Sequence, residues 1–458
     1  MIPRRLRLVA VPALTVLAVL AVLAGVVAAW RPGEGVILYA TPVGQHPGLI
    51  AVDARTGRAF VLNGGSYAMN ASGGIVEGSV SVLDTRTGAL VRTIPAGTAP
   101  QAVVVDERTE RVFVLNSYMH NGGHGTVTVL DAGDGRPIRT TRVGDLPQAE
   151  VLDDRDNRVF VLNLNNSLNQ THTSVSVLDA TSGRLAGSID VPAGNVDQSA
   201  SALTIDEHQG RVLAVTNGQP GYGALLNIID ARRETLVSTR VVKWAGGGIG
   251  TDVTLGHAFA FGQDNIRMLD TATGRVLSSV RIKPYLNFGG AAVDVRTGRV
   301  FVVSLKWDNN GHQTNSARML VLDARTGALL RTVSIPWPGG VAVDARMGQA
   351  LVTSVGPVDR NGDPTGAGAI SVLDGRSGAV LRTISLGLAP GALAIDPCAG
   401  HTLVVEGGGV MSIPDAWAWL PGWLRGRLPF LPPPGTQSRA IPARVVVLDT
   451  ARLLTERR

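Results

Sequence analysis

Short runs of Val, Ile, Leu and Ala that end in aspartate recur along the chain from residue 35 onward. One unit reads AVDARTGRAFVLN (Ala51–Asn63), and VVVDERTERVFVLN (Val103–Asn116) repeats it. In each unit an apolar run ends in Asp, a polar turn follows, and a second apolar run begins. Runs of this length, bounded by Asp, Asn and Gly, predict a β-hairpin.

Two hairpin patterns alternate along the chain. In the first, the turn begins at Asp53, Asp106, Asp153, Asp206, Asp252, Asp294, Asp344 and Asp396, and the copy at Thr251–Phe261 is degenerate. The second, as in SVSVLDTRTGALVRTI, places its aspartates at Asp84, Asp131, Asp179, Asp230, Asp270, Asp323, Asp374 and Asp449. Two hairpins every ~50 residues give the four strands of a propeller blade. Blades stacked radially cover one another's apolar faces.

The sequence therefore predicts an all-β fold, a single β-propeller of about eight four-stranded antiparallel blades over residues 35–450, with seven blades as the alternative. The last unit leaves little room for a fourth strand before the tail at 451–458. GVILYA, residues 35–40, has the character of that strand. We expect it to complete the final blade and close the ring.

The repeated aspartates are interpreted as turn formers and not as catalytic acids. An Asp carboxylate can accept hydrogen bonds from backbone N–H groups two and three residues on. The glycine that usually follows supplies a positive φ at little steric cost.

The first thirty residues predict a membrane anchor. Arg4, Arg5 and Arg7 precede 23 uncharged residues from Leu8 to Trp30, enough to cross a bilayer as a transmembrane helix. Residues 1–7 would form a cytoplasmic stub, with the propeller on the extracytoplasmic side of the cell membrane. The alternative is a signal peptide cleaved after Ala29, giving a secreted protein. Cys398 is the sole cysteine, so no intrachain disulfide forms.

Several segments resemble the YVTN β-propeller repeat family. Its signature tetrapeptide corresponds to FVLN at Phe60–Asn63, Phe113–Asn116 and Phe160–Asn163. A V-G-x-x-P lead-in is present at Val43–Pro47 and Val143–Pro147. The resemblance covers nearly everything after residue 35. It implies the propeller fold and does not specify a function, because such repeats occur in surface-layer proteins, binding modules and redox enzymes.

The connections differ between the two ends of the predicted blades. The Asp-led hairpins are short and fall on one face. The loops between second and third strands are long and varied, at Gly64–Ser79, Ser117–Gly125, Leu164–Thr173, Leu305–Ala317, Val355–Gly368 and Gly407–Ala443. Function tends to reside on variable loops carried by a rigid scaffold. We expect an envelope protein or glycan to bind this face.

Some loop residues are weak candidates for a metal site. Imidazoles are common metal ligands, and the three histidines are His120, His124 and His172. Asp359, Asn361 and Asp363 imitate the start of a calcium loop without its distant Glu. Hydrogen-bonded histidines and an Asn/Asp/Gly turn are the favoured interpretations. No cofactor is predicted.

Residues 407–443 form a Trp- and Pro-rich insertion in the last unit. The candidate contact residues are Trp417, Trp419, Trp423, Arg425 and Arg427. Trp and Arg are favoured at lipid headgroups, and exposed aromatic residues also anchor protein partners. The alternative is a flap folded over the end of the propeller.

The sequence contains neither a nucleophile elbow nor a P-loop. Its net charge of +6 is spread over many turns, without the basic and aromatic cluster of a nucleic-acid site. A monomeric, noncatalytic binding or scaffolding module is the leading hypothesis. The alternatives are an enzyme or redox accessory, similar to quinone-cofactor dehydrogenases or lactonases, and a surface-layer protein. An enzyme would require titratable residues that converge on the central channel.

Overall fold

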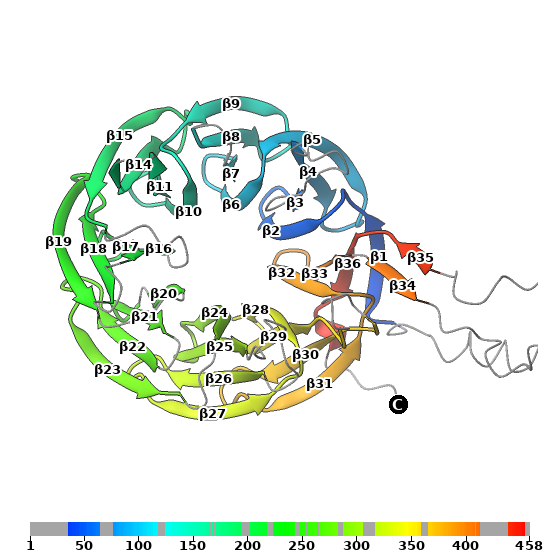
Figure 1. Ribbon diagram of the computed structural model, residues 1–458. Helices are drawn as coiled ribbons and strands as arrows, with labels where there is room; N and C mark the ends of the chain where they lie inside the picture. Colours follow the sequence, from blue (N-terminus) through cyan, green and yellow to red (C-terminus); the bar gives the residue numbers. More distant parts are fainter. Residues whose placement is uncertain are drawn as a thin grey trace, which may run out of the picture.

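The chain folds into a ring of eight four-stranded antiparallel sheets around a central axis (Figure 1). The computed structural model describes residues 35–64, 77–117, 124–164, 166–167, 170–171, 173–193, 202–217, 223–242, 248–252, 254–262, 265–282, 287–305, 317–358, 365–407, 409–412 and 438–453. The prediction of an all-β propeller is confirmed, and the blade number is eight and not seven.

Each of the first four blades is an antiparallel meander that runs outward from the axis. Blade 1 is β2 (Pro47–Asp53), β3 (Arg58–Asn63), β4 (Glu77–Asp84) and β5 (Leu90–Thr98). Blade 2 is β6 (Pro100–Asp106), β7 (Arg111–Asn116), β8 (Thr126–Asp131) and β9 (Pro137–Arg142). Blade 3 is β10 (Pro147–Asp153), β11 (Arg158–Asn163), β14 (Thr173–Asp179) and β15 (Leu185–Val191), with a small ribbon of β12 (Asn166–Ser167) and β13 (Gln170–Thr171). Blade 4 is β16 (Ala202–Asp206), β17 (Arg211–Asn217), β18 (Ala224–Asp230) and β19 (Thr235–Val242).

Blades 5 to 7 follow the same order. Blade 5 is β20 (Ile249–Asp252), β21 (His257–Phe261), β22 (Asn265–Asp270) and β23 (Val276–Arg281). Blade 6 is β24 (Asn287–Asp294), β25 (Arg299–Leu305), β26 (Arg318–Asp323) and β27 (Leu329–Ser334). Blade 7 is β28 (Pro338–Asp344), β29 (Gln349–Ser354), β30 (Ala369–Asp374) and β31 (Val380–Ser385). The degenerate fifth unit thus builds a complete blade.

Blade 8 joins the two ends of the chain. Its inner strands are β32 (Pro390–Asp396), β33 (His401–Glu406) and β36 (Arg444–Asp449), and its outermost strand is β1 (Ile37–Pro42). β1 begins two residues later than the expected 35–40. A ribbon of β34 (Gly409–Ser412) and β35 (Ser438–Ile441) leaves this blade, and a short 3₁₀ turn, η1 (Ala451–Leu453), follows β36.

Apolar side chains from the facing surfaces of neighbouring blades form the core. Phe60, Phe113, Phe160, Phe259 and Phe301 of the second strands are fully buried. Among the described residues, Ala59 and Val61 of blade 1 pack in one cluster with Leu403 and Val445 of blade 8. Burial of this kind is the main stabilising contribution to the fold. The first and last blades are therefore packed together as any other neighbours are.

The hairpin turns behave as the sequence predicts. Asp53 Oδ1 accepts hydrogen bonds from the backbone N–H groups of Arg55 and Thr56, both at 2.9 Å. The turn glycines have positive φ, as at Gly57 (67°) and Gly298 (66°). Glu110, Asn157 and Glu234 hold φ of 55–58° in three turns that lack the glycine.

The expected membrane anchor, residues 8–30, and the stub before it lie outside the described residues. Among those described, no helix has the length and apolarity needed to cross a bilayer.

Candidate functional site

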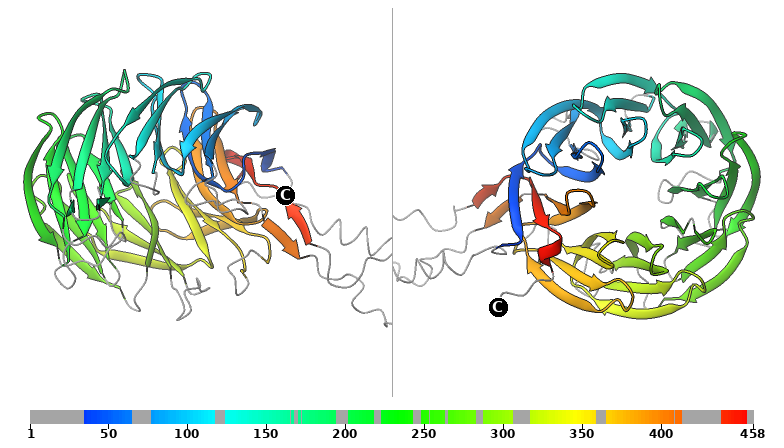
Figure 2. Two further views of the ribbon diagram at one scale, coloured as in Figure 1. Left: turned by 45° about the horizontal axis from the view of Figure 1, so that its top comes forward. Right: turned by 180° about the vertical axis from the view of Figure 1, so that it is seen from behind.

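The two faces of the ring differ in their connections. We call the end that carries the Asp-led hairpins the turn face, and the opposite end, where second strands stop and third strands start, the loop face. Figure 2 shows the ring tilted by 45° and from behind. The turn face is bound together by contacts between blades, whereas the loop face contains a cavity at the junction of blades 8, 1 and 2.

One recurring contact on the turn face comes from the first residue of several second strands. Arg58 Nε donates to the carbonyl of Gly133 in blade 2 at 3.1 Å. His257 Nδ1 lies 3.0 Å from the carbonyl of Ala324, and His401 Nδ1 lies 2.7 Å from that of Thr85. These side chains connect their own blade to the next. The two histidines, to which the sequence assigned no role, therefore contribute to the contacts between blades.

A second contact joins the first aspartate of a blade to the following blade. Thr85 Oγ1 donates to Asp396 Oδ2, and Thr271 Oγ1 donates to Asp206 Oδ2, both at 2.5 Å. In five other blades alanine or glycine occupies the position of the threonine: Ala132, Ala180, Ala231, Ala324 and Gly375. There the second oxygen is buried without a hydrogen-bond partner, in Asp53, Asp106, Asp153, Asp252 and Asp294.

Sharp corners lead into five innermost strands on the loop face. The residue before each proline has a left-handed backbone, and these residues are His46 (φ 50°), Ala99 (50°), Leu146 (47°), Trp337 (43°) and Ala389 (47°). The backbone carbonyl of His46 accepts a hydrogen bond from the N–H of Gly64 at 3.1 Å. Non-glycine residues with such φ values are strained and are maintained by their surroundings. These five residues therefore constrain the backbone at the point where the chain enters the innermost strands on the loop face.

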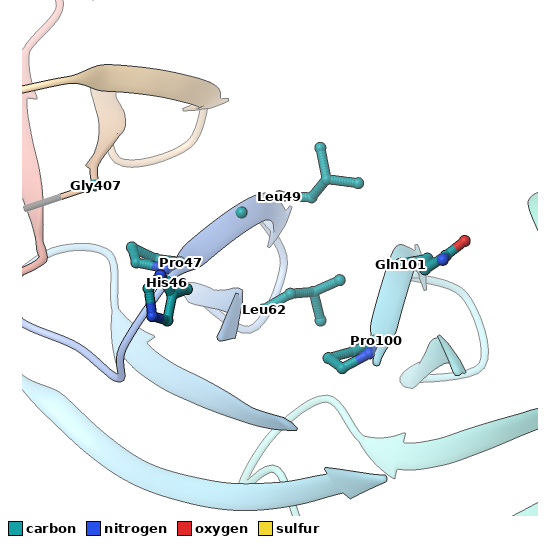
Figure 3. Close-up of a pocket in the computed structure, with 8 residues that line it drawn as sticks. His46, Pro47, Leu49, Leu62, Pro100, Gln101 and Gly407 are labelled. Atoms are coloured by element: carbon teal, nitrogen blue, oxygen red, sulfur yellow. The ribbon is translucent and has the colours of Figure 1, made fainter. Parts of the chain in front are cut away.

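A cavity of about 380 Å³ lies on the loop face where the ring closes. We call it the seam cavity, and its lining residues are His46, Pro47, Gly48, Leu49, Leu62, Pro100, Gln101 and Gly407. They come from blades 1, 2 and 8. In Figure 3, Leu62 lies between the His46–Pro47 corner and Pro100. Leu62 is buried, whereas His46 is exposed and Leu49 is 47% exposed. An apolar floor with a few polar groups at the rim is typical of a ligand site.

An ion pair fixes the edge of this cavity that blade 8 supplies. Glu406, which is 2% exposed, accepts hydrogen bonds from Arg444 Nε and from the Gly387 N–H, each at 2.6 Å. Gly407 follows directly and leads to the ribbon β34–β35. The base of the insertion is therefore held rigidly beside the cavity.

Only one of the metal candidates falls among the described residues. His124 Nδ1 lies 2.5 Å from Asp145 Oδ1, and both line an outer cavity of about 480 Å³ with Arg142 and Asp190. His120, His172, Asp359, Asn361 and Asp363 lie outside the described residues, as do Trp417, Trp419, Trp423, Arg425 and Arg427. Within the described part of the chain, no three His, Cys, Asp or Glu side chains gather in a metal-binding arrangement.

The innermost strands carry small apolar residues, and one acidic residue interrupts them. Gly340, Ala342, Gly391 and Ala394 are partly exposed on these strands. Glu150 of β10 is 7% exposed, and neither of its carboxyl oxygens has a hydrogen-bond partner. Burial raises the pKa of Glu150 well above its usual value.

The fold defines the class of protein, a β-propeller. Quinohemoprotein alcohol dehydrogenase from Comamonas testosteroni is similar, with a TM-score of 0.54 and 13% identity over 92% of this chain and 76% of that one. A europium-containing methanol dehydrogenase gives a TM-score of 0.53 and 11% identity over 92% and 93% of the two chains. Identities this low show a shared fold alone.

No protein-family model matches the sequence, and no curated protein matches it significantly. Membership of the YVTN repeat family therefore stays a prediction from the motifs.

Sequence reasoning missed the residues that line the seam cavity. His46 and Leu49 belong to blade 1, Gln101 to blade 2 and Gly407 to blade 8, and only the packing of neighbouring blades brings them together. The V-G-x-x-P lead-in was the available signal, since it marks the corner that carries His46.

Proposed function

We propose that the chain is a membrane-tethered extracytoplasmic binding module that holds a segment of an envelope protein at its loop face. The seam cavity is the observation that carries this proposal. Its floor of Leu62, Pro47 and Pro100 suits an apolar side chain, and the His46 imidazole and Gln101 amide at its rim suit the polar backbone beside it.

Two features support a binding surface in place of a catalytic centre. The left-handed corner at His46 and the ion pair of Glu406 with Arg444 fix the walls of the cavity in advance. Preorganised walls increase affinity because little ordering is left for the binding step. We propose no second function, because the likeness to the dehydrogenases is one of fold.

Site-specific photocrosslinking in living cells tests the binding proposal. A benzophenone amino acid replaces Leu49 at the cavity or, as a control, Met347 on the turn face, and the two side chains are equally exposed at 47%. We expect a discrete polypeptide adduct from position 49 alone. The Gly48→Trp substitution should abolish it by filling the cavity, since a side chain added at Gly48 meets no atom within 4 Å. Adducts that are identical at both positions, or a glycan in place of a polypeptide, would contradict the proposal.

The topology is tested separately through Cys398, which is exposed and is the chain's single cysteine. A membrane-impermeant maleimide should label it in intact spheroplasts, and carbonate washing should leave the protein in the membrane fraction. Labelling that requires lysis would place the propeller in the cytoplasm, and release by carbonate would rule out the tether.

A further inference from the structure

Exposed apolar side chains gather on the outermost strands of the blades. We call them the outer belt, and its members are Leu90, Val91, Ile138, Leu185, Val237, Val241, Val276, Leu277, Leu329, Leu330, Val380, Leu381 and Tyr39. Every blade contributes at least one. Exposed apolar side chains of this kind offer contacts to a partner or a membrane where several of them lie on one side of the ring.

The belt meets the entry point of the chain at blade 8. β1 is the outer strand of that blade, and Ile37 at its start pairs with Leu448 next to the last turn. Arg452 Nη1 donates to the backbone carbonyl of Gly35 at 3.1 Å and holds the entry in place. Residues 31–34 separate Gly35 from the apolar stretch that ends at Trp30. Five extended residue steps reach at most about 17 Å, so a tethered β1 lies close to the bilayer.

Side chains of the two adjoining blades continue the belt on either side of β1. In blade 7, Arg382 Nη1 donates to the carbonyls of Arg452 and Leu453, both at 3.2 Å. On the other side, the Thr41 hydroxyl of β1 donates to the carbonyl of Gly88 in blade 1 at 2.5 Å, and a side chain at Gly88 would collide with Tyr39. We call the exposed apolar residues of these three blades, Tyr39, Leu90, Val91, Val380 and Leu381, the blade 8 edge.

The chemistry of this edge suits a lipid surface. Tyr39 combines an apolar ring with a hydroxyl, as side chains at the membrane interface do. Arg92, which follows Val91 in β5, is also exposed, and basic side chains are attracted to the phosphate groups of lipids.

We propose that the ring stands on its side, with the blade 8 edge against the extracytoplasmic leaflet of the membrane. This inference rests on the tether proposed above. The ribbon β34–β35 points away from the ring on the same side as β1 in every view (Figures 1 and 2). Edge-on docking leaves both the loop face and the seam cavity open to a partner beside the membrane.

Fluorescence quenching in proteoliposomes tests the orientation with the full-length chain. In a Cys398→Ser background, Leu381→Cys, Val91→Cys and Val237→Cys are each labelled with an environment-sensitive fluorophore. The three side chains are similarly exposed, at 48%, 45% and 51%. Val237 lies on the outer strand of blade 4, across the ring from blade 8, and is the matched control. The vesicles contain phosphatidylethanolamine, phosphatidylglycerol and a spin-labelled lipid.

The emission of the fluorophores at positions 381 and 91 should shift to shorter wavelengths and be quenched by the spin-labelled lipid. The emission of the fluorophore at position 237 should stay unchanged. Equal quenching at all three positions would indicate a ring lying flat, and no quenching at any would indicate a ring held away from the bilayer. Either result overturns the docking proposal while the tether stands, provided that the protein remains with the vesicles after carbonate washing. Release by carbonate would overturn the tether and the docking with it.

Discussion

Single side chains at the junctions between blades decide whether a buried carboxylate finds a partner. Asp206 and Asp396 have both oxygens satisfied because a threonine of the next blade donates to them. Asp53 lacks that donor, since Ala132 stands where the hydroxyl would be, and its Oδ2 is buried without a partner. A buried polar atom without a hydrogen-bond partner lowers the stability of the fold by about 1–3 kcal/mol. The ring therefore has a repeated local weakness on its turn face.

Ala132→Thr should raise the free energy of unfolding by about 1 kcal/mol, because its hydroxyl would donate to Asp53 as Thr85 does to Asp396. Chemical denaturation measures the change, and Ala132→Val is the control of equal shape. An equal rise in the unfolding free energy for both variants would show that packing, and not the new hydrogen bond, stabilises the protein.

Glu150 is the second residue whose environment is unusual. Ile50, Val103, Leu203, Val341 and Leu393 take the corresponding position on other innermost strands. Its raised folded-state pKa means that the unfolded chain loses its proton at a lower pH than the native protein does. The contribution of Glu150 to stability is therefore lost progressively as the pH rises above 4.5, the ordinary pKa of a glutamate carboxyl.

Glu150→Leu should stabilise the protein at neutral pH, because it removes a buried carboxyl that has no partner. The difference in unfolding free energy between this variant and the native protein should grow between pH 5 and pH 7, because the buried Glu150 carboxyl destabilises the native fold more as the pH rises. Denaturation midpoints at several pH values measure it, with Glu150→Gln as a neutral variant of similar shape. A gain that is independent of pH would show that Glu150 does not titrate in this way.

At the scale of the element, the hairpin turns set the geometry of every blade. Most place glycine at the left-handed position before the second strand, but Glu110 holds φ of 58° there. A non-glycine residue in this region costs about 1–2 kcal/mol. The ion pair of Glu110 with Arg55 is about half exposed at each end and offsets little of that cost.

Glu110→Gly should therefore stabilise the chain by about 1 kcal/mol. Gly298→Ala, at a matching turn with open space around the new side chain, should destabilise it by a similar amount. Thermal unfolding of both variants gives the comparison. The same sign of change for both substitutions would contradict the explanation by φ.

The sequence predicted these elements well because their cause is local. An apolar run, an aspartate and a glycine specify a hairpin with no reference to the rest of the chain. What could not be predicted comes from neighbouring blades. The contact of His401 with Thr85 joins residues 316 positions apart, and no spacing rule links them. The burial of Glu150 depends likewise on the facing blade.

At the scale of the whole molecule, the features on which both proposals rest lie close together where the ring closes. The entry of the chain, the seam cavity and the ribbon β34–β35 all lie at blade 8 or directly beside it. Figure 1 shows both ends of the described chain meeting there. The closing pairing of β1 with β36 places the entry of the chain, and Gly407 after β33 brings blade 8 to the cavity and the ribbon. The functional proposals therefore depend on where and how the ring closes.

Disulfide trapping measures this closure most directly. Ala40 pairs with Val446 across β1 and β36, so Ala40→Cys with Val446→Cys, in a Cys398→Ser background, lies within bridging distance. We predict rapid formation of one intrachain bond, identified by mass spectrometry of unreduced peptides, and none for the control pair Ala40→Cys with Arg444→Cys. Equal bridging of both pairs, or a bond between two chains, would contradict a ring closed by its own first strand.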